Sequence, residues 1–228
     1  MRLPTPEPLI LMEDNHLIVI RKPAGMPSQG DETGDLSALD WVKNHLKIKY
    51  QKPGEVFTAL VHRLDRPVGG VMIFGKTSKA AKRLTEQFQT KTIQKTYHAV
   101  TEKIPAEPSG TLTHYLKKLP GKNIVRAYQK PVHDTKVAVL DYKTLQDDGR
   151  RAFLEIHPQT GRQHQIRVQL SAIGCTIVGD VKYGKSDFLP DGSIALWAFR
   201  LELEHPISKK KLTFETLPEQ QFPWEGWN

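Results

Sequence analysis

The chain has 228 residues, and its 33 lysines and arginines exceed its 25 aspartates and glutamates by a formal net charge of +8. A chain of this length buries a sizeable core without staples, and its single cysteine, Cys175, excludes a framework of internal disulfides. The positive balance favours a polyanionic partner such as RNA, because neutralised phosphates release counterions, although scattered lysines also simply solvate a surface.

The sequence carries no recognisable metal, membrane or export signal. The nine histidines show neither a Cys-x-x-Cys partner nor His-Glu-x-x-His spacing, so we expect no metal site. No apolar run approaches the roughly 20 residues that a membrane span requires. The apolar run near the start is four residues long, which is too short for the core of a signal peptide. We therefore expect a cytoplasmic protein and, by default, a monomer.

The first part of the chain predicts two strands and two helices. The apolar run at 17–20 predicts a short buried strand. Residues 36–46 carry apolar side chains at helical spacing, and Asp35 is placed to cap that helix. The apolar run at 69–76 predicts another strand, and the amphipathic stretch 77–88 predicts a second helix.

The rest of the chain is richer in strands. Extended stretches of β-type composition predict strands at 95–100, 135–145, 151–158 and 194–205. A helix is expected at 161–174, with Gly174 placed to end it. Stretches that contain proline and glycine predict loops at 104–110 and 118–121. Many strands, few helices and no regular alternation of strand and helix indicate an α+β sheet protein rather than a doubly wound one.

Residues 70–77, Gly-Val-Met-Ile-Phe-Gly-Lys-Thr, satisfy the pattern G-x-x-x-x-G-K-[ST] of a nucleotide-binding loop. Such a loop curls its backbone amides around phosphates, which requires small and flexible residues. The four intervening residues here instead prefer extended structure and a buried position. We therefore interpret the match as accidental, and Thr77 or Ser78 as an ordinary helix cap.

The stretch "VHRLDRPVGG" at 61–70 places Asp65 close to two arginines, Arg63 and Arg66. Guanidinium groups on both sides would stabilise the ionised form of the carboxylate. The two glycines at the end of the stretch would let a backbone or a ligand approach closely. Taken alone, an Asp–Arg pair is more often structural than catalytic.

Three stretches considered together change that interpretation: "VHRLDRPVGGVMIFGKTSKAA" at 61–81, "QKTYHAV" at 94–100 and "HPQTGRQHQIRVQLSAIGCTIVGDVKYG" at 157–184. Their order and spacing resemble those of the RluA-type family of RNA pseudouridine synthases. The resemblance implies a single catalytic domain over 1–228, with its core at 10–218 and no separate N-terminal RNA-binding module. It also implies a mixed, mostly antiparallel bent sheet, flanked by a few helices and loops, with the active site in a central basic cleft.

The family resemblance implies isomerisation of uridine to pseudouridine in ribosomal or transfer RNA. No cofactor or metal is implied, because uracil leaves its ribose and rejoins it through carbon 5 without oxidation. Asp65 matches the family's nucleophile, and attack on the sugar or on the base ring both stay open. Tyr97 matches the family's active-site tyrosine, which stacks on the extruded base near the proton lost from carbon 5. Arg167 matches the arginine that orients the carboxylate.

Other basic residues of the motifs are expected to bind RNA. Arg63 resembles a family residue that fills the space left by the flipped nucleotide. Arg162, expected at the start of a helix, suits a phosphate. The expected RNA-binding residues are Arg63, Arg66, Arg162, His62, Lys22 and Lys95. A solvated surface charge, or for His62 a structural hydrogen bond, is an equally good account of these side chains.

Two positions depart from the family pattern: Gly69 stands where a small hydroxyl residue is common, and Trp197 where a histidine is usual. We expect neither to contact the nucleophile. Selection of the RNA would rest on the catalytic domain and its loops, including 110–130. Two alternatives stay open, a non-catalytic RNA-binding protein that has kept the fold and an NTPase built on residues 70–77.

Overall fold

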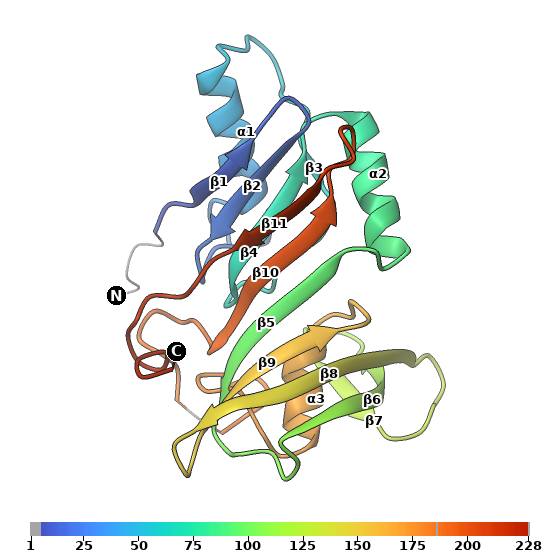
Figure 1. Cartoon of the computed structure of the whole chain (residues 1–228), viewed down its shortest axis with the longest axis vertical. Coiled ribbons are helices and arrows are strands. Elements are labelled where there is room, and N and C mark those ends of the chain that lie inside the picture. Colours follow the sequence, from blue (N-terminus) through green and yellow to red (C-terminus); the bar gives the residue numbers. More distant parts are fainter. Residues whose placement is uncertain (1–5, 186, 228) are drawn as a thin grey trace. The chain divides into compact units, whose positions relative to one another are not determined.

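The computed structural model describes residues 6–185 and 187–227. Within them, eleven strands and three helices confirm the α+β class (Figure 1). The chain folds into two compact units. The first unit comprises the residues up to Gln94 together with Ala198–Leu217, and the second comprises Lys95–Trp197 and the residues from Pro218 onward. The single catalytic domain expected from the sequence stays a prediction.

The first unit is built on a sheet whose central strands are buried. Its strands are β1 (Leu9–Glu13), β2 (Leu17–Lys22), β3 (Ala59–Leu60), β4 (Gly69–Gly75), β10 (Leu196–Glu204, in this unit from Ala198) and β11 (Lys211–Glu215). They lie in the order β1-β2-β4-β10, with β3 also paired to β4 and β11 also paired to β10. β2 and β4 run antiparallel, from Leu17 opposite Gly75 to Lys22 opposite Gly70. Both strands have continuous apolar runs, as expected for strands inside a core.

Helix α2 (Ser78–Gln89) packs against this sheet, and its start was predicted correctly. Thr77 caps it, because the Thr77 hydroxyl accepts a hydrogen bond from Ala80 N. The apolar face of α2 joins strand side chains in a core whose members are all at most 5% exposed. This core consists of Leu17, Val19, Val71, Ile73, Leu84, Ile93, Leu201 and Leu203.

Helix α1 (Ala38–Lys49) begins two residues later than the predicted start. Ser37 is the N-cap in place of Asp35, because the Ser37 hydroxyl accepts from Asp40 N and donates to the Asp40 carboxylate. This reciprocal pair stabilises the first turn more completely than a single acceptor could. Asp35 forms an ion pair elsewhere. Leu36, expected on the apolar face, is 50% exposed.

The nucleotide-loop pattern at 70–77 does not form a phosphate loop. Residues Gly69–Gly75 form β4, and every one of them is buried. A Cβ at Gly75 would lie 3.0 Å from the backbone of Ala81, so this glycine serves helix packing. Lys76 Nζ is bound to the Glu13 carboxylate at 2.8 Å, and its side chain is 9% exposed. The interpretation of the match as accidental is confirmed.

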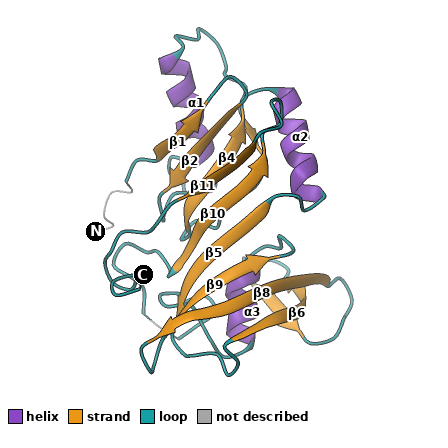
Figure 2. Cartoon of the chain, viewed as in Figure 1, coloured by secondary structure: helices purple, strands orange, loops and turns teal. Residues whose placement is uncertain are grey.

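The second unit is an antiparallel sheet with one helix (Figure 2). Its strands lie in the order β5 (Gln94–Thr101, in this unit from Lys95), β9 (Ala152–Pro158), β8 (Lys136–Asp147), β6 (Ser109–Lys118) and β7 (Val125–Tyr128). The loops predicted at 104–110 and 118–121 are found at 104–108 and 119–121, and β6, which the sequence did not predict, lies between them. The reason is that polar His114 occupies a buried position between Leu112 and Leu116, which interrupts the apolar alternation.

Helix α3 (Gln165–Ala172) starts later than the predicted position 161. His164 has a φ of 53°, a left-handed conformation through which a right-handed helix cannot continue. Gly174, with a φ of 78°, lies just beyond the helix end, as predicted. α3 covers one face of the sheet, where buried side chains form a cluster of Leu116, Val125, Ala138 and Val168.

Candidate active site

Asp65 lies in the loop between β3 and β4, and its side chain is half-buried. The residue before it, Leu64, is 6% exposed and anchors the loop in the interior. The chain turns directly after it, since Val68 N donates to Asp65 O at 3.0 Å. The carboxylate is therefore presented from a fixed turn and is not sealed inside the core.

The backbone on both sides of Asp65 is held by the turn that follows β2. Ser28 Oγ donates to Leu64 O at 2.7 Å and accepts from Leu64 N at 3.0 Å, so one buried hydroxyl fixes both polar groups of a residue. On the other side, Gly25 N donates to Arg66 O at 2.8 Å. Gly25 has a φ of 84°, which glycine adopts without strain. Neutral hydrogen bonds thus bracket the acidic residue.

Lys22 also stabilises the turn that follows β2, from a buried position. It has no exposed surface, and its Nζ donates to Met26 O at 2.7 Å, Pro23 O at 3.0 Å and Arg66 O at 3.4 Å. Burial lowers the pKa of Lys22 from 10.5 to about 7, although the charge of Asp65 acts in the opposite direction. The expected contact between Lys22 and RNA is wrong, because a side chain without accessible surface cannot reach a phosphate.

The two arginines beside Asp65 have different surroundings. The Arg66 guanidinium forms ion pairs with Asp31, at 3.3 Å, and with Asp35. The hydrogen bond from Arg66 is the main reason that the pKa of Asp35 lies below its usual value. Arg63 is exposed and makes no hydrogen bond or ion pair with any residue that the structure describes. Of these two expected RNA-binding residues, only Arg63 has its charge uncommitted within the described chain.

His62 has structural contacts. Its Nε2 accepts a hydrogen bond from Ile73 N at 3.0 Å, so the proton of the neutral ring is on Nδ1. Its ring stacks on Phe88, with 4.8 Å between the centroids. These contacts support the structural interpretation of His62 that the sequence left open beside RNA binding.

Gly70 allows two backbones to approach each other. Its φ is 122°, and a Cβ at this position would lie 2.3 Å from Ala198 O in β10. Any side chain here would displace the neighbouring strand. The close approach that the sequence predicted after Asp65 is therefore to a backbone.

Arg167 is held in the interior of the second unit by a carboxylate and an aromatic ring. It is 5% exposed; its Nε donates to Asp180 Oδ2 at 2.7 Å and its Nη2 to Asp180 Oδ1 at 2.8 Å. The ring of Tyr183 lies 5.2 Å from the guanidinium carbon. A bidentate carboxylate and an aromatic face together fix both the plane and the position of the guanidinium.

The sequence prediction missed Asp180 and Tyr183. Asp180 is 1% exposed and pairs with Arg167, while the Tyr183 hydroxyl lies 2.6 Å from His164 Nδ1 and accepts from Val125 N at 2.9 Å. Both residues lie in "GDVKYG", the end of the third motif. A single acidic residue directly after the apolar run Thr176–Gly179 was the signal that could have identified Asp180.

Tyr97 lies on the face of the sheet that α3 covers. It is half-buried in β5, directly opposite Ile156 of β9, and Ile156 is directly opposite Tyr142 of β8. Direct partners in antiparallel strands point to the same face, and so do alternate residues of one strand. Tyr142 therefore shares its face with Ala138, which packs against α3. The second unit thus places Tyr97 on the side of the helix that carries Arg167.

Lys95 and Arg162 lie near the loop that precedes α3. The Lys95 Nζ is 4.0 Å from the position that a Cβ of Gly161 would occupy. Arg162 is exposed, and its Nε donates to Val137 O at 3.0 Å. The helix starts three residues beyond Arg162, so this side chain does not lie in the first helical turn that the sequence predicted. Its exposure leaves it a candidate for a phosphate contact.

The comparisons with known proteins follow the same residues. A family model described as RNA pseudouridylate synthase matches residues 16–172, which is more than half of the chain. The chain belongs to the RNA pseudouridylate synthase family. The matched region contains Asp65, Tyr97 and Arg167 and ends before Asp180, so the carboxylate that holds the arginine lies outside it.

Two curated relatives support the RluA-type resemblance. The chain is 34% identical over 210 residues to a ribosomal large subunit pseudouridine synthase C of Rickettsia felis, covering 90% of this chain and 66% of the relative. It is 30% identical over 244 residues to a tRNA pseudouridine synthase C of Pectobacterium carotovorum, covering 95% of this chain and 60% of the relative. The chain thus spans less than two thirds of the length of these relatives.

A solved structure of the family has the same fold. The structure named human RNA pseudouridylate synthase domain containing 4 matches with a TM-score of 0.76 and 26% identity, over 92% of this chain and 89% of that chain. No described helix of the present chain is long and apolar enough to cross a membrane. Among the described residues, no group of three or more His, Cys, Asp or Glu side chains could hold a metal ion.

Proposed function

We propose that this chain isomerises uridine to pseudouridine in RNA. The proposal agrees with membership of the RNA pseudouridylate synthase family. The observation that carries it is the presentation of Asp65: hydrogen bonds from Ser28 and Gly25 fix the backbone of both adjacent residues, while the side chain itself is half-buried. A carboxylate held in this way can meet a flipped nucleotide without a change in the fold.

The proposed reaction breaks the bond between ribose C1′ and uracil N1 and forms a bond between C1′ and carbon 5. The proton on carbon 5 is lost and N1 gains one, so the atoms balance without a cofactor or an oxidant. Asp65 is the proposed nucleophile, toward the sugar or the base. The target uridine must first leave its stack, at a cost of a few kcal/mol.

Tyr97 and Arg167 are the proposed partners of Asp65. Tyr97 would stack on the everted uracil and accept the proton from carbon 5. Arg167 would keep the carboxylate ionised and oriented. The bidentate hold of Asp180 supports this role, because a buried guanidinium that is already fixed needs no reorganisation during the reaction.

Three basic residues are the proposed RNA contacts. Arg63 is exposed beside the nucleophile and would fill the gap left by the flipped base. Arg162 is exposed before α3 and would bind a phosphate, and Lys95 near Gly161 would bind another. Arg66 and His62 support the loop that carries Asp65 and would act on RNA through it. A central basic cleft is part of this proposal.

The relatives suggest the kind of substrate. Those named above are named for ribosomal and for transfer RNA, so we propose one of these two classes for this chain. A monomer in the cytoplasm that works without metal is the simplest form of the enzyme consistent with the sequence.

The release of tritium from RNA tests the proposed function. Uridine-rich RNA labelled with tritium at carbon 5 should lose label to water when incubated with the protein. Asp65→Asn should abolish the release while RNA affinity persists, because the amide keeps the shape of the side chain and lacks its nucleophilic charge. Asp187→Asn, a change in an exposed aspartate of the second unit, is the matched control and should release tritium like the wild type.

Two results would contradict the proposal. Unchanged release by Asp65→Asn would remove Asp65 from its role. RNA binding without release from either class of RNA would favour the alternative of a binding protein that has kept the fold.

A further inference from the structure

The sheet of the second unit has a second face, opposite α3. Side chains alternate between the two faces along each strand. Leu116 of β6 and Val125 of β7 pack on the α3 side, so Tyr115 and Arg126 point to the opposite side. In Figure 2, α3 lies behind β8 and β6, and the face without a helix is turned toward the viewer.

Two tyrosines lie side by side on this face. Tyr115 of β6 is directly opposite Tyr128 of β7, and on its other side it is directly opposite Val137 of β8. The next pair of these two strands on the same face is Lys117 opposite Arg126. We call these five residues the tyrosine face: Tyr115, Lys117, Arg126, Tyr128 and Val137.

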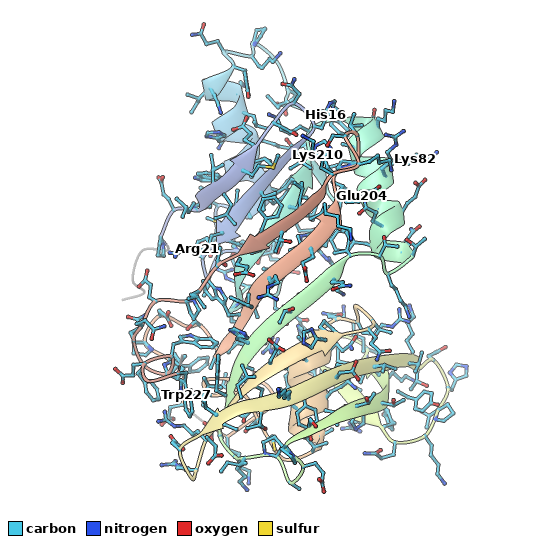
Figure 3. The ribbon with its side chains drawn as sticks, in the orientation of Figure 1. His16, Arg21, Lys82, Glu204, Lys210 and Trp227 are labelled. Atoms are coloured by element: carbon cyan, nitrogen blue, oxygen red, sulfur yellow. The ribbon has the colours of Figure 1, made fainter. Side chains whose placement is uncertain are left out.

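Among the described residues, the C-terminal segment covers the β9 end of this side of the sheet. There Trp227, which is labelled in Figure 3 and is 8% exposed, stacks against Phe153 of β9, with 6.0 Å between the ring centroids. Over the tyrosine face, Val137 is 42% exposed and both tyrosines are partly exposed. The β9 end is thus covered by an aromatic side chain of the protein itself, whereas the tyrosine face is partly open to solvent.

The polar groups of the tyrosine face have few partners. The hydroxyls of Tyr115 and Tyr128 and the guanidinium of Arg126 make no hydrogen bond or ion pair with any residue in the described ranges. Lys117 Nζ donates to His133 O at 2.9 Å. The acidic side chain nearest along β8, Asp141, already accepts hydrogen bonds from other residues. The surface is thus aromatic and cationic at once.

We propose that the tyrosine face binds unpaired nucleotides of the RNA substrate, with bases stacked on the two phenol rings and phosphates bound by Arg126 and Lys117. Every base offers a flat aromatic surface, and aromatic platforms flanked by basic side chains are a common solution for single strands. A protein partner is less favoured, because the apolar area is narrow and cations border it. The inference rests on the proposed function for the identity of the RNA.

This surface is separate from the chemistry. Tyr97 and Arg167 belong to the side of the sheet that α3 covers, whereas the tyrosine face is on the opposite side. Nucleotides bound there would belong to a segment of the RNA that passes around the β7 edge of the sheet. Loss of the tyrosine face should therefore weaken the hold on long RNA and leave the reaction itself intact.

Direct binding is the first test. A fluorescein-labelled single-stranded oligouridine is titrated into the full chain, and its anisotropy is followed. Tyr128→Leu or Tyr115→Leu should weaken binding about fivefold to a hundredfold, the worth of one lost base stack. Tyr128→Phe keeps the ring and should bind within about twofold of the wild type, since stacking does not use the hydroxyl. Phe57→Leu removes an exposed aromatic ring of the first unit and is the control for nonspecific effects.

Catalysis is the second test. On RNA with an unpaired extension, tritium release by Tyr128→Leu should show a raised KM and an unchanged kcat. On a short hairpin without the extension, the variant should match the wild type. Arg126→Gln, an exposed and unpartnered position within the described chain, should raise KM in the same way and covers the case that a leucine variant fails to fold.

The outcomes separate this inference from the proposed function. If the leucine variants bind oligouridine like the wild type, and the wild type releases tritium, RNA binding by the tyrosine face is contradicted and the proposed enzymatic function stands. A phenylalanine variant as weak as the leucine variant would also overturn stacking. If the wild type releases no tritium but the leucine variants still lose RNA binding, the tyrosine face is retained as an RNA-binding surface and the proposed enzymatic function is contradicted. A concentration-dependent dimer that the leucine variants abolish, with RNA binding unchanged, would assign the surface to a second copy of the chain instead.

Discussion

The two units of this protein hold their charged site residues in different ways. In the first unit, neutral hydrogen bonds from Ser28 and Gly25 fix the backbone on both sides of Asp65. In the second unit, Arg167 is placed by its own side chain, which a buried carboxylate grips at two nitrogens. The first arrangement fixes the chain that carries the acid, and the second fixes the charge itself.

This difference follows from what each group has to do in the proposed reaction. For the proposed nucleophile, fixing the backbone on both sides sets where its carboxylate emerges from the loop. The guanidinium of Arg167 must be held in one plane if it is to orient another group. The carboxylate of Asp180 holds it there, although this arrangement buries two charges. We therefore expect different effects on stability and catalysis from removing Asp180, which holds Arg167, and from removing the Ser28 hydroxyl, which holds the backbone beside Asp65.

The largest effect is expected from Asp180→Asn. It leaves the buried guanidinium of Arg167 without its counter-charge, which should lower the free energy of unfolding by about 3–5 kcal/mol. Denaturation by urea measures this loss. Asp187→Asn, in an exposed loop position of the same unit, should stay close to the wild type. If Asp180→Asn lowers the free energy of unfolding no more than Asp187→Asn does, Asp180 does not stabilise the buried charge of Arg167.

The next effect is expected from Ser28→Ala. It leaves the buried N–H and C=O of Leu64 without their partner, which should cost about 1–3 kcal/mol of stability. Asp65 is the next residue after Leu64, so its carboxylate should be less well placed in this variant. The kcat for tritium release should therefore fall while KM stays constant. Ser78→Ala, at the exposed start of α2, should change neither quantity. If kcat for Ser28→Ala is equal to that of the wild type, the backbone support is irrelevant to catalysis.

The buried Lys22 predicts a dependence of stability on pH. Its pKa is about 7 in the folded chain and 10.5 ordinarily, so between these values the unfolded chain binds a proton that the folded chain does not. The free energy of unfolding should therefore rise with pH across this window, by up to about 1.4 kcal/mol per pH unit, and the full penalty should apply below pH 7. Unfolding of wild type and Lys22→Met at pH 7 and pH 9 isolates the contribution. Parallel pH profiles for the two proteins would show that burial does not shift this amine.

The smallest effect concerns the cap of α1. Ser37→Ala should cost about 1 kcal/mol, because the helix loses the acceptor for Asp40 N. Asp35→Ala should cost less, since this residue contributes exposed contacts to Arg66 and Thr33. Chemical denaturation of both variants compares them, and a larger loss for Asp35→Ala would restore the cap that the sequence predicted.

The sequence predicted well where periodicity was strong. The apolar runs of β2 and β4 and the face of α2 were found at nearly the observed residues. It failed where the local pattern conflicts with tertiary packing: β6 carries a buried histidine, and α3 begins after His164, whose left-handed backbone no pattern reveals. The sequence therefore missed β6 altogether, whereas it found α3 and its end and misplaced only the start of the helix.

The candidate site divides in the same way. Asp65, Tyr97 and Arg167 stand in recognisable motifs, so the sequence could name them. The residues that hold them could not be named, since Ser28 is 36 positions away from Leu64 in the chain and meets it only after folding. Lys22 was placed at the surface because lysines are usually exposed, whereas three backbone carbonyls receive its amine in the interior.

The most direct measurement for the central claim is the pseudouridine content of RNA after incubation with the protein. The RNA is digested to nucleosides, and pseudouridine is separated from uridine by chromatography. We predict that the wild type forms pseudouridine at defined positions, whereas Asp65→Asn binds the same RNA with equal Kd and forms none. Pseudouridine formed by Asp65→Asn at the wild-type rate, or none formed by the wild type from RNA that it binds, would contradict the role of this carboxylate.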